Sequence, residues 1–155
     1  MKHCVMNAPE RPEYADALNE LEPILYNLPP KVVAIDGKPG VGKTTLGRFL
    51  AWRFNISLIE TDLYLHRSRG LYIYREEEVK GVINSRKQSD RPVIVEGVVA
   101  LRLLDNLNVT PDFHIHVICE AASSSTASDY PEYLKQFQPA ENANLVLNLS
   151  KLSRT

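Results

Sequence analysis

The sequence lacks the features that mark several specialised classes of protein. Its two cysteines, Cys4 and Cys119, are too few for a disulfide framework and lack the spacing of a metal site. No segment has the ~18 uninterrupted apolar residues of a membrane span, because Glu96 interrupts the most apolar run. The N-terminus lacks the basic-then-apolar order of a signal peptide. We therefore expect free thiols, a cytoplasmic location and no membrane partner.

The sequence also lacks an excess of charge. It has 18 lysines and arginines against 19 acidic residues, for a net charge of −1, so we expect no nucleic-acid partner. Basic residues are scarce toward the C-terminus, where only Lys135, Lys151 and Arg154 follow Leu103. The length of 155 residues and the 44% hydrophobic content predict a single domain spanning residues 1–155.

What the sequence does contain is a complete phosphate-binding loop. Residues 37–44 match the pattern G-x-x-x-x-G-K-[ST], in which Lys43 contacts the outer phosphates and the Thr44 hydroxyl can bind Mg²⁺. A β-branched run precedes the loop and helically spaced apolar residues follow it, which is the context that the motif requires. The predicted cofactors are ATP and Mg²⁺, since no Asn-Lys-x-Asp guanine motif occurs. The predicted nucleotide-binding residues are Gly37, Lys38, Pro39, Gly40, Val41, Gly42, Lys43, Thr44 and Thr45.

Predicted strands and helices alternate along the chain. The N-terminal apolar stripe predicts a helical region that is bent or restarted at Pro23, and residues 63–74 are expected to form a loop or irregular helix. The alternation indicates an α/β domain whose ligands gather at the carboxyl ends of the strands. Strands are predicted at 31–36, 56–60, 91–97, 112–118 and 144–149, and helices after the phosphate loop and at 76–88, 98–107 and 130–137.

Two carboxylates occur at the ends of predicted strands, where ligands are expected. Phosphoryl transfer requires a phosphate cradle, a metal and a carboxylate near the attacking hydroxyl. We predict that Lys43, Asp62 and Glu96 are catalytic. In this interpretation Asp62, with Glu60 beside it, orients and deprotonates an acceptor hydroxyl, and Glu96 holds a Mg²⁺-bound water or the acceptor. The alternatives are a turn or helix-capping carboxylate for Asp62 and a structural acid for Glu96, which burial would force to be compensated.

Aromatic and cationic residues are mixed in one segment after Asp62. Ring stacking and guanidinium hydrogen bonds suit a small anionic or ring-bearing acceptor, whereas the alternative is a solvated segment with tyrosines lying over the core. The segment contains Tyr64, His66, Arg67, Arg69, Tyr72, Tyr74 and Arg75, of which Tyr64, Arg67, Arg69 and Tyr74 are the predicted substrate-binding residues.

A second pair of polar residues lies inside a predicted strand. His114 and His116 face the same side of that strand, as a metal-binding pair does. No third ligand lies near them in the sequence. We therefore expect packed, hydrogen-bonded histidines.

Several stretches resemble the uridine kinase and phosphoribulokinase group. The strand that ends at Glu96-Gly97, the later Asp112-Phe113, the Asp36-Gly37 start and Asp62-Leu63-Tyr64 carry this resemblance. Residues 42–62 are equally similar to shikimate and gluconate kinases, and residues 139–146 to the segment that borders adenine in nucleoside kinases. The resemblance implies a three-layer P-loop NTPase fold with a five-stranded parallel sheet of order 2-3-1-4-5. It also implies that Asp62 is the catalytic base. The resemblance covers about residues 31–149, and residues 1–30, which precede it, are expected to form an N-terminal helical extension.

The lid region departs from that group. Its members close an arginine-bearing lid after the fourth strand, whereas residues 119–138 here form a reduced lid with a serine-rich stretch and no arginine. Lys38, Lys135, Arg67 or a partner chain would have to supply the missing charge, and the sequence allows a homodimer. We predict transfer of the γ-phosphate of ATP to a hydroxyl of a small nucleoside- or sugar-like acceptor. The alternative is a nucleotide-binding protein with weak or no turnover.

Overall fold

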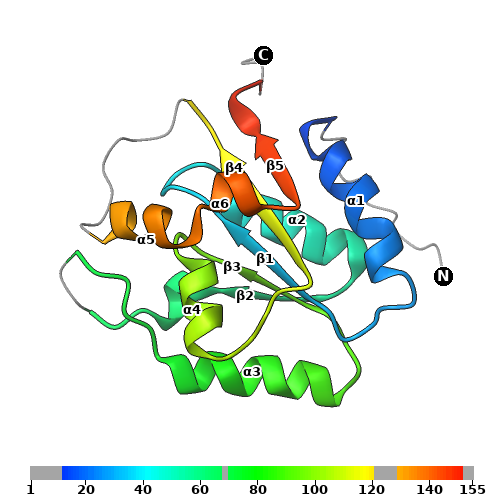
Figure 1. Cartoon of the computed structure of the whole chain (residues 1–155). Helices are drawn as coiled ribbons and strands as arrows, with labels where there is room; N and C mark the ends of the chain where they lie inside the picture. The colour runs from blue at the N-terminus through cyan, green and yellow to red at the C-terminus, as the bar shows by residue number, and fades with distance from the viewer. Residues whose placement is uncertain (1–11, 68–69, 121–128, 152–155) are drawn as a thin grey trace.

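The computed structural model describes residues 12–67, 70–120 and 129–151 (Figure 1). The strands are β1 (Val32–Asp36), β2 (Ser57–Glu60), β3 (Val93–Glu96), β4 (Phe113–Ile118) and β5 (Leu145–Asn148). The α-helices are α1 (Ala15–Leu25), α2 (Lys43–Phe54), α3 (Glu76–Gln88), α4 (Ala100–Asn106), α5 (Tyr130–Phe137) and α6 (Pro139–Asn142). Short 3₁₀ turns are η1 (Pro12–Tyr14), η2 (Thr61–Tyr64) and η3 (Leu149–Lys151).

The five strands form one parallel sheet in the order β2-β3-β1-β4-β5, which confirms the predicted topology. Every residue of β1 and β3 is buried, as expected for apolar central strands that are covered on both faces. The register pairs Ile35 with Glu96 and Asp36 with His116. The ends of β1, β3 and β4 therefore bring polar side chains to one edge of the sheet.

Helices cover both faces of the sheet, so the molecule has the predicted three layers (Figure 1). On one face, α1 and α2 enclose a core that includes Leu21 and Leu46. On the other face, α3, α4 and α5 enclose a second core that includes Ile83, Leu103 and Tyr133. No helix in the described ranges is long and apolar enough to cross a membrane.

Three local predictions need correction or refinement. Helix α1 does not restart at Pro23 but continues to Leu25, so the proline lies in the last turn of a single helix. Helix α6 has four residues, too few for its periodicity to be visible in the sequence. In the loop after η2, Leu65 and Tyr74 form an antiparallel bridge that joins its two ends. Residues 121–128 of the predicted lid segment lie outside the described residues.

A single glycine sets how closely the ends of β2 and β3 approach. Gly97 directly follows β3 and lies against Thr61, the first residue after β2. A Cβ atom on Gly97 would lie 1.9 Å from the Thr61 Oγ1 atom. Only glycine allows this contact, and the contact fixes the position of Asp62 relative to Glu96.

We expect Gly97→Ala to lower the free energy of unfolding by about 1–3 kcal/mol, because the added methyl group overpacks this contact. Gly81→Ala is a matched control within α3, where a Cβ atom meets no atom within 4 Å. Removing this helical glycine should stabilise the protein by about 0.5–1 kcal/mol. Urea unfolding measures both values, and a neutral Gly97→Ala would contradict the close approach.

Candidate functional site

The phosphate loop joins β1 to α2 and turns at two glycines with positive backbone angles. Gly40 has φ 79° and Gly42 has φ 99°, values that glycine adopts without strain. Lys43 begins α2 and is only 7% exposed. Its Nζ atom donates a hydrogen bond of 2.7 Å to the carbonyl oxygen of Lys38. The ammonium group is therefore folded back over the loop, where a phosphate oxygen would meet it.

The charge on Lys43 is held in a buried environment. Burial lowers the pKa of Lys43, and the nearby carboxylates of Glu96, Asp62 and Asp36 oppose this effect. The ammonium group therefore depends on negative charge around it. A bound polyphosphate would add to that negative charge.

Glu96 faces the start of the same helix. Its side chain is 2% exposed, and the Thr44 Oγ1 atom donates a hydrogen bond of 2.9 Å to Glu96 Oε1. Burial raises the pKa of Glu96, whereas the hydrogen bond from Thr44 and the charge of Lys43 act to lower it. The hydroxyl and the carboxylate are hard oxygen donors of the type that Mg²⁺ prefers. These two residues thus fit a magnesium ion held by Thr44 directly and by Glu96 through water.

One pocket connects the phosphate loop to Asp62. Its volume is about 520 Å³, and it is lined by Pro39, Gly40, Gly42, Lys43, Thr44, Thr45, Asp62, Leu65, Tyr72 and Val98. Asp62 is exposed and is the second residue of η2, so it does not cap a helix. Glu60 is committed elsewhere, because Arg48 Nη2 contacts its Oε1 atom at 2.6 Å. Asp62 is therefore the carboxylate of this pair that faces the pocket.

The residues predicted to bind the acceptor lie in different places. Tyr64 is half-buried beneath the Arg75 guanidinium, which lies 5.8 Å from the centre of its ring. Tyr74 is 6% exposed and packs in the core beside α3 and α4, which favours the alternative interpretation for this tyrosine. Arg67 is exposed and is not among the residues that line the pocket, and Arg69 lies outside the described residues.

Tyr72 lines the pocket, although it was not among the predicted substrate-binding residues. It belongs to the same aromatic and cationic segment as Tyr74. The positions of the tyrosines in the sequence of this segment do not distinguish one that lines a pocket from one that packs in the core. Burial raises the pKa of Tyr72, and the charges of Asp62 and Asp129 reinforce this shift, so its phenol stays protonated.

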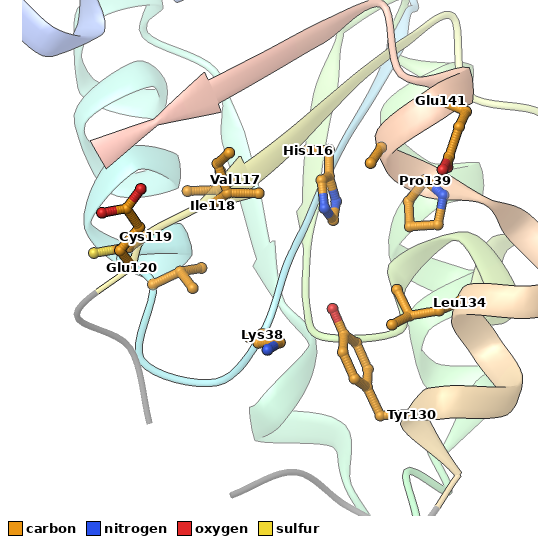
Figure 2. A pocket seen from close by; sticks show the side chains of 12 residues that line it. Lys38, His116, Val117, Ile118, Cys119, Glu120, Tyr130, Leu134, Pro139 and Glu141 are labelled. Atoms are coloured by element: carbon orange, nitrogen blue, oxygen red, sulfur yellow. The ribbon is translucent and has the colours of Figure 1, made fainter. Parts of the chain in front are cut away.

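A second pocket, of about 400 Å³, lies beside the phosphate loop at Lys38 and Val41 (Figure 2). The end of β4 forms one wall and the helices α5 and α6 form another. Beyond the two loop residues it is lined by His116, Val117, Ile118, Cys119, Glu120, Tyr130, Leu134, Pro139, Ala140 and Glu141. The phosphate loop thus contributes to both pockets, and its first residue, Gly37, is buried against the carbonyl oxygen of Val117.

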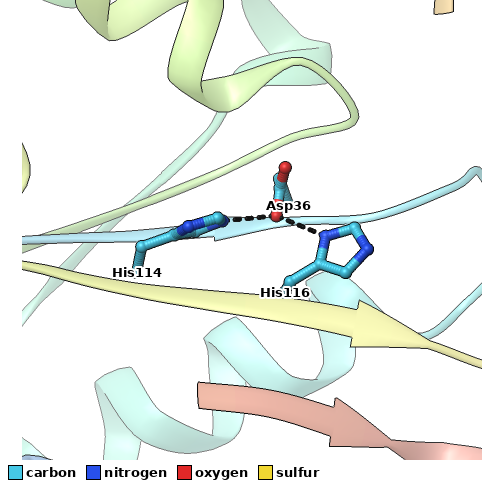
Figure 3. A group of neighbouring side chains, drawn as sticks. All are labelled: Asp36, His114 and His116. Atoms are coloured by element: carbon cyan, nitrogen blue, oxygen red, sulfur yellow. Dashed lines mark hydrogen bonds and ion pairs between the residues drawn. The ribbon is translucent and has the colours of Figure 1, made fainter. Parts of the chain in front are cut away.

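The last residue of β1, Asp36, is fully buried in contact with both strand histidines (Figure 3). Its Oδ1 atom lies 2.6 Å from His114 Nε2 and 2.8 Å from His116 Nδ1. Its Oδ2 atom accepts a hydrogen bond of 2.5 Å from the Tyr133 hydroxyl. Burial acts to raise the pKa of Asp36, but the bonds to the two histidines outweigh it, so the pKa lies below its usual value. The prediction of packed, hydrogen-bonded histidines is confirmed, but Asp36 was missed as their partner.

Comparisons with known proteins agree with this geometry at the level of the fold. The model of the ATPase family associated with various cellular activities matches residues 33–107, a span that includes the phosphate loop, Asp62 and Glu96. The structure of a possible uridine kinase from Bacillus stearothermophilus aligns with 87% of this chain and 99% of that chain, with 16% identity and a TM-score of 0.60. No significant match exists among curated proteins.

Two further structures align with lower TM-scores. A gluconokinase from Sinorhizobium meliloti 1021 covers 77% of this chain and 81% of its own, with 16% identity and a TM-score of 0.49. A shikimate kinase from Bacteroides thetaiotaomicron covers 80% of this chain and 90% of its own, with 14% identity and a TM-score of 0.47. The alignment with the uridine kinase structure, together with the strand order, shows that the chain has the P-loop fold of small-molecule kinases.

The raised pKa of Glu96 predicts a pH-dependent stability. The folded state favours the protonated carboxyl, so this contribution is fully present below the ordinary value of 4.5 and is lost as the pH rises through the folded pKa. Glu96→Gln keeps an oxygen for Thr44 but cannot ionise. The variant should therefore gain stability relative to the wild type as the pH rises.

Urea unfolding at a series of pH values from about 4 to 8 measures this difference. A Glu77→Gln variant on the exposed side of α3 corrects for the loss of one carboxylate. A difference between Glu96→Gln and the wild type that stays constant over the whole range would contradict a raised pKa of Glu96.

Proposed function

We propose that the protein is an ATP-dependent phosphotransferase that moves the γ-phosphate to a hydroxyl of a small nucleoside- or sugar-like acceptor. The observation that carries this proposal is the 520 Å³ pocket, in which the phosphate loop and the Asp62 carboxylate share one space. A phosphate cradle and an acidic group that line one pocket are what in-line phosphoryl transfer needs. Glu96 lies behind Thr44 and completes the polar set.

The phosphate loop and the start of α2 bind the triphosphate. Backbone N–H groups of the loop and the N-terminus of the helix attract the phosphate oxygens. Lys43 exchanges its hydrogen bond to the Lys38 carbonyl oxygen for a charge-assisted bond to a phosphate oxygen. Mg²⁺, held by Thr44 and through water by Glu96, would neutralise charge on the phosphate oxygens when it is bound.

Asp62 acts on the acceptor in this scheme. Its carboxylate is exposed to the pocket and accepts the proton of the acceptor hydroxyl as that oxygen attacks the γ-phosphorus atom. The bond from the γ-phosphorus to the bridging oxygen breaks at the same time, and ADP leaves with that oxygen. Tyr72 and Leu65 line the same pocket and offer an aromatic and an apolar surface for the body of the acceptor.

The 400 Å³ pocket suits the nucleotide base. It adjoins the phosphate loop, and Tyr130 and Leu134 line it from α5 (Figure 2). Pro139, Ala140 and Glu141 belong to the stretch that resembles the adenine-bordering segment of nucleoside kinases. An ATP molecule would then place its base beside α5 and α6 and its phosphates in the loop.

A second candidate function is nucleotide binding without efficient turnover. The observation that favours it is that three arginines of the described chain are each paired with a carboxylate. Arg102 contacts Asp129 at 2.5 Å, Arg48 contacts Glu60 at 2.6 Å, and Arg75 contacts Glu78 at 3.4 Å. Charge for the transferred group would then have to come from Lys38, Lys135, Arg67 or a second copy of the chain.

We expect Asp62→Asn to lower the rate of acceptor-dependent ADP release by about 10²–10⁴-fold while ATP affinity is retained, because only proton transfer is removed. Asp105→Asn, at an exposed site on α4, is the control and should keep full activity. The assay uses a panel of nucleosides, sugars and hydroxy acids with ATP and Mg²⁺. Unchanged turnover in Asp62→Asn would remove this residue from its role. Tight ATP binding without ADP release from any acceptor would favour the second function.

Filling the base pocket should separate its contribution from that of the phosphate loop. We expect Ala140→Trp to weaken ATP binding about tenfold or more, equivalent to about 1.4 kcal/mol, while inorganic tripolyphosphate still binds. Lys43→Ala should weaken both ligands, since it removes a charge-assisted contact worth about 1.5–3 kcal/mol. Calorimetry with Mg²⁺ measures both affinities. Equal ATP affinity in Ala140→Trp and wild type would place the base elsewhere.

A further inference from the structure

The three groups at the end of β1 and in β4 have a use that phosphoryl transfer does not require. We propose that Asp36, His114 and His116 form a binding site for a divalent transition metal of the zinc class at the root of the phosphate loop. Each residue offers one donor atom, and these atoms lie within 4.8 Å of one another (Figure 3). The three residues are at most 6% exposed, so the donors are held away from bulk water.

The geometry of the donors supports a single binding point. Both imidazole rings direct a nitrogen at the same carboxylate oxygen, Asp36 Oδ1, although they approach it from different positions along β4. Zinc bonds of about 2.0–2.1 Å at tetrahedral angles separate neighbouring donors by roughly 3.3 Å. The present separations of 2.6 and 2.8 Å are hydrogen-bond lengths. To hold the ion, the carboxylate would withdraw by about half an ångström and the two rings would turn until their nitrogens are also roughly 3.3 Å apart.

The types of donor atom indicate which class of metal the site would bind. Two imidazole nitrogens and one carboxylate oxygen suit zinc, cobalt, nickel or copper, whereas magnesium prefers oxygen ligands alone. The site is therefore distinct from the one that Thr44 and Glu96 offer. Metal binding places the ring proton of each histidine on its other nitrogen, so neutral imidazoles need release no proton.

A supporting contact is already in place on the far side of the carboxylate. The Tyr133 hydroxyl donates to Asp36 Oδ2, which leaves Oδ1 for the metal. Ligating carboxylates in proteins are commonly held by such a hydrogen bond, which fixes their orientation. Burial raises the pKa of Tyr133, as does the adjacent Asp36 charge, so the phenol remains a donor.

The proposed metal site lies beside the 400 Å³ pocket and at the start of the phosphate loop. His116 also lines the 400 Å³ pocket, so that pocket reaches one of the three donor residues. Asp36 directly precedes Gly37, the first residue of the phosphate loop. An ion bound there would join β1 to β4 where the loop begins.

The test is a titration of the purified full chain with Co²⁺, which gives strong visible absorption when nitrogen and oxygen donors surround it in four-coordinate geometry. We expect one equivalent of Co²⁺ to produce these bands and Zn²⁺ to displace it and raise the melting temperature. His116→Ala should abolish the bands. His66→Ala, which removes an exposed histidine, should leave them unchanged.

A second variant keeps all three donor residues, so a change in its metal affinity cannot be explained by the loss of a ligand. Tyr133→Phe should retain the Co²⁺ bands but lower the affinity for Zn²⁺ by about 10–100-fold, because it removes the hydrogen bond to Asp36. Absent bands in the wild type, or bands that survive in His116→Ala, would show that the cluster is a hydrogen-bonded network only. Neither result depends on ATP binding or turnover.

Discussion

Three charged side chains, Asp36, Lys43 and Glu96, are buried at one edge of the sheet, and each needs a neighbour to compensate its charge. Asp36 receives hydrogen bonds from three side chains, Glu96 receives one from Thr44, and Lys43 donates to a backbone carbonyl. The carboxylates and the ammonium group also attract one another. The organisation of the site follows from this constraint, because each of the three buried charges is compensated by groups that the site itself supplies.

The sheet explains why these groups gather. Strands β1 and β3 are apolar up to their last residue and are covered on both faces, so their acidic residues fit only where each strand ends. In a parallel sheet all carboxyl ends lie at one edge, and the register sets Asp36 and Glu96 on neighbouring strands only one step apart. The phosphate loop begins at this edge, which is why its lysine lies among carboxylates. The same arrangement leaves two pockets, one on each side of the loop.

Local patterns in the sequence were sufficient to predict the fold and much of the candidate site. The phosphate motif, the alternating strands and helices and the acidic end of β3 are each contained in a short segment. The partnership of Asp36 with His116 and Tyr133 was not predictable in that way, because it depends on register and on a helix 97 residues away. Tyr72 and Tyr74 were likewise indistinguishable, since their exposure is decided by packing against α3 and α4 rather than by their spacing.

The hydrogen bond from Tyr133 ties α5 to the residue that precedes the phosphate loop. The same helix contributes Leu134 to the wall of the second pocket. A ligand that displaces Asp36 when it shifts the loop would also change the free energy of docking α5, and a molecule held against α5 would then change the affinity of the loop by the same factor, since thermodynamic linkage is reciprocal. The Tyr133 hydroxyl is thus a direct physical link between the wall of the second pocket and the start of the loop.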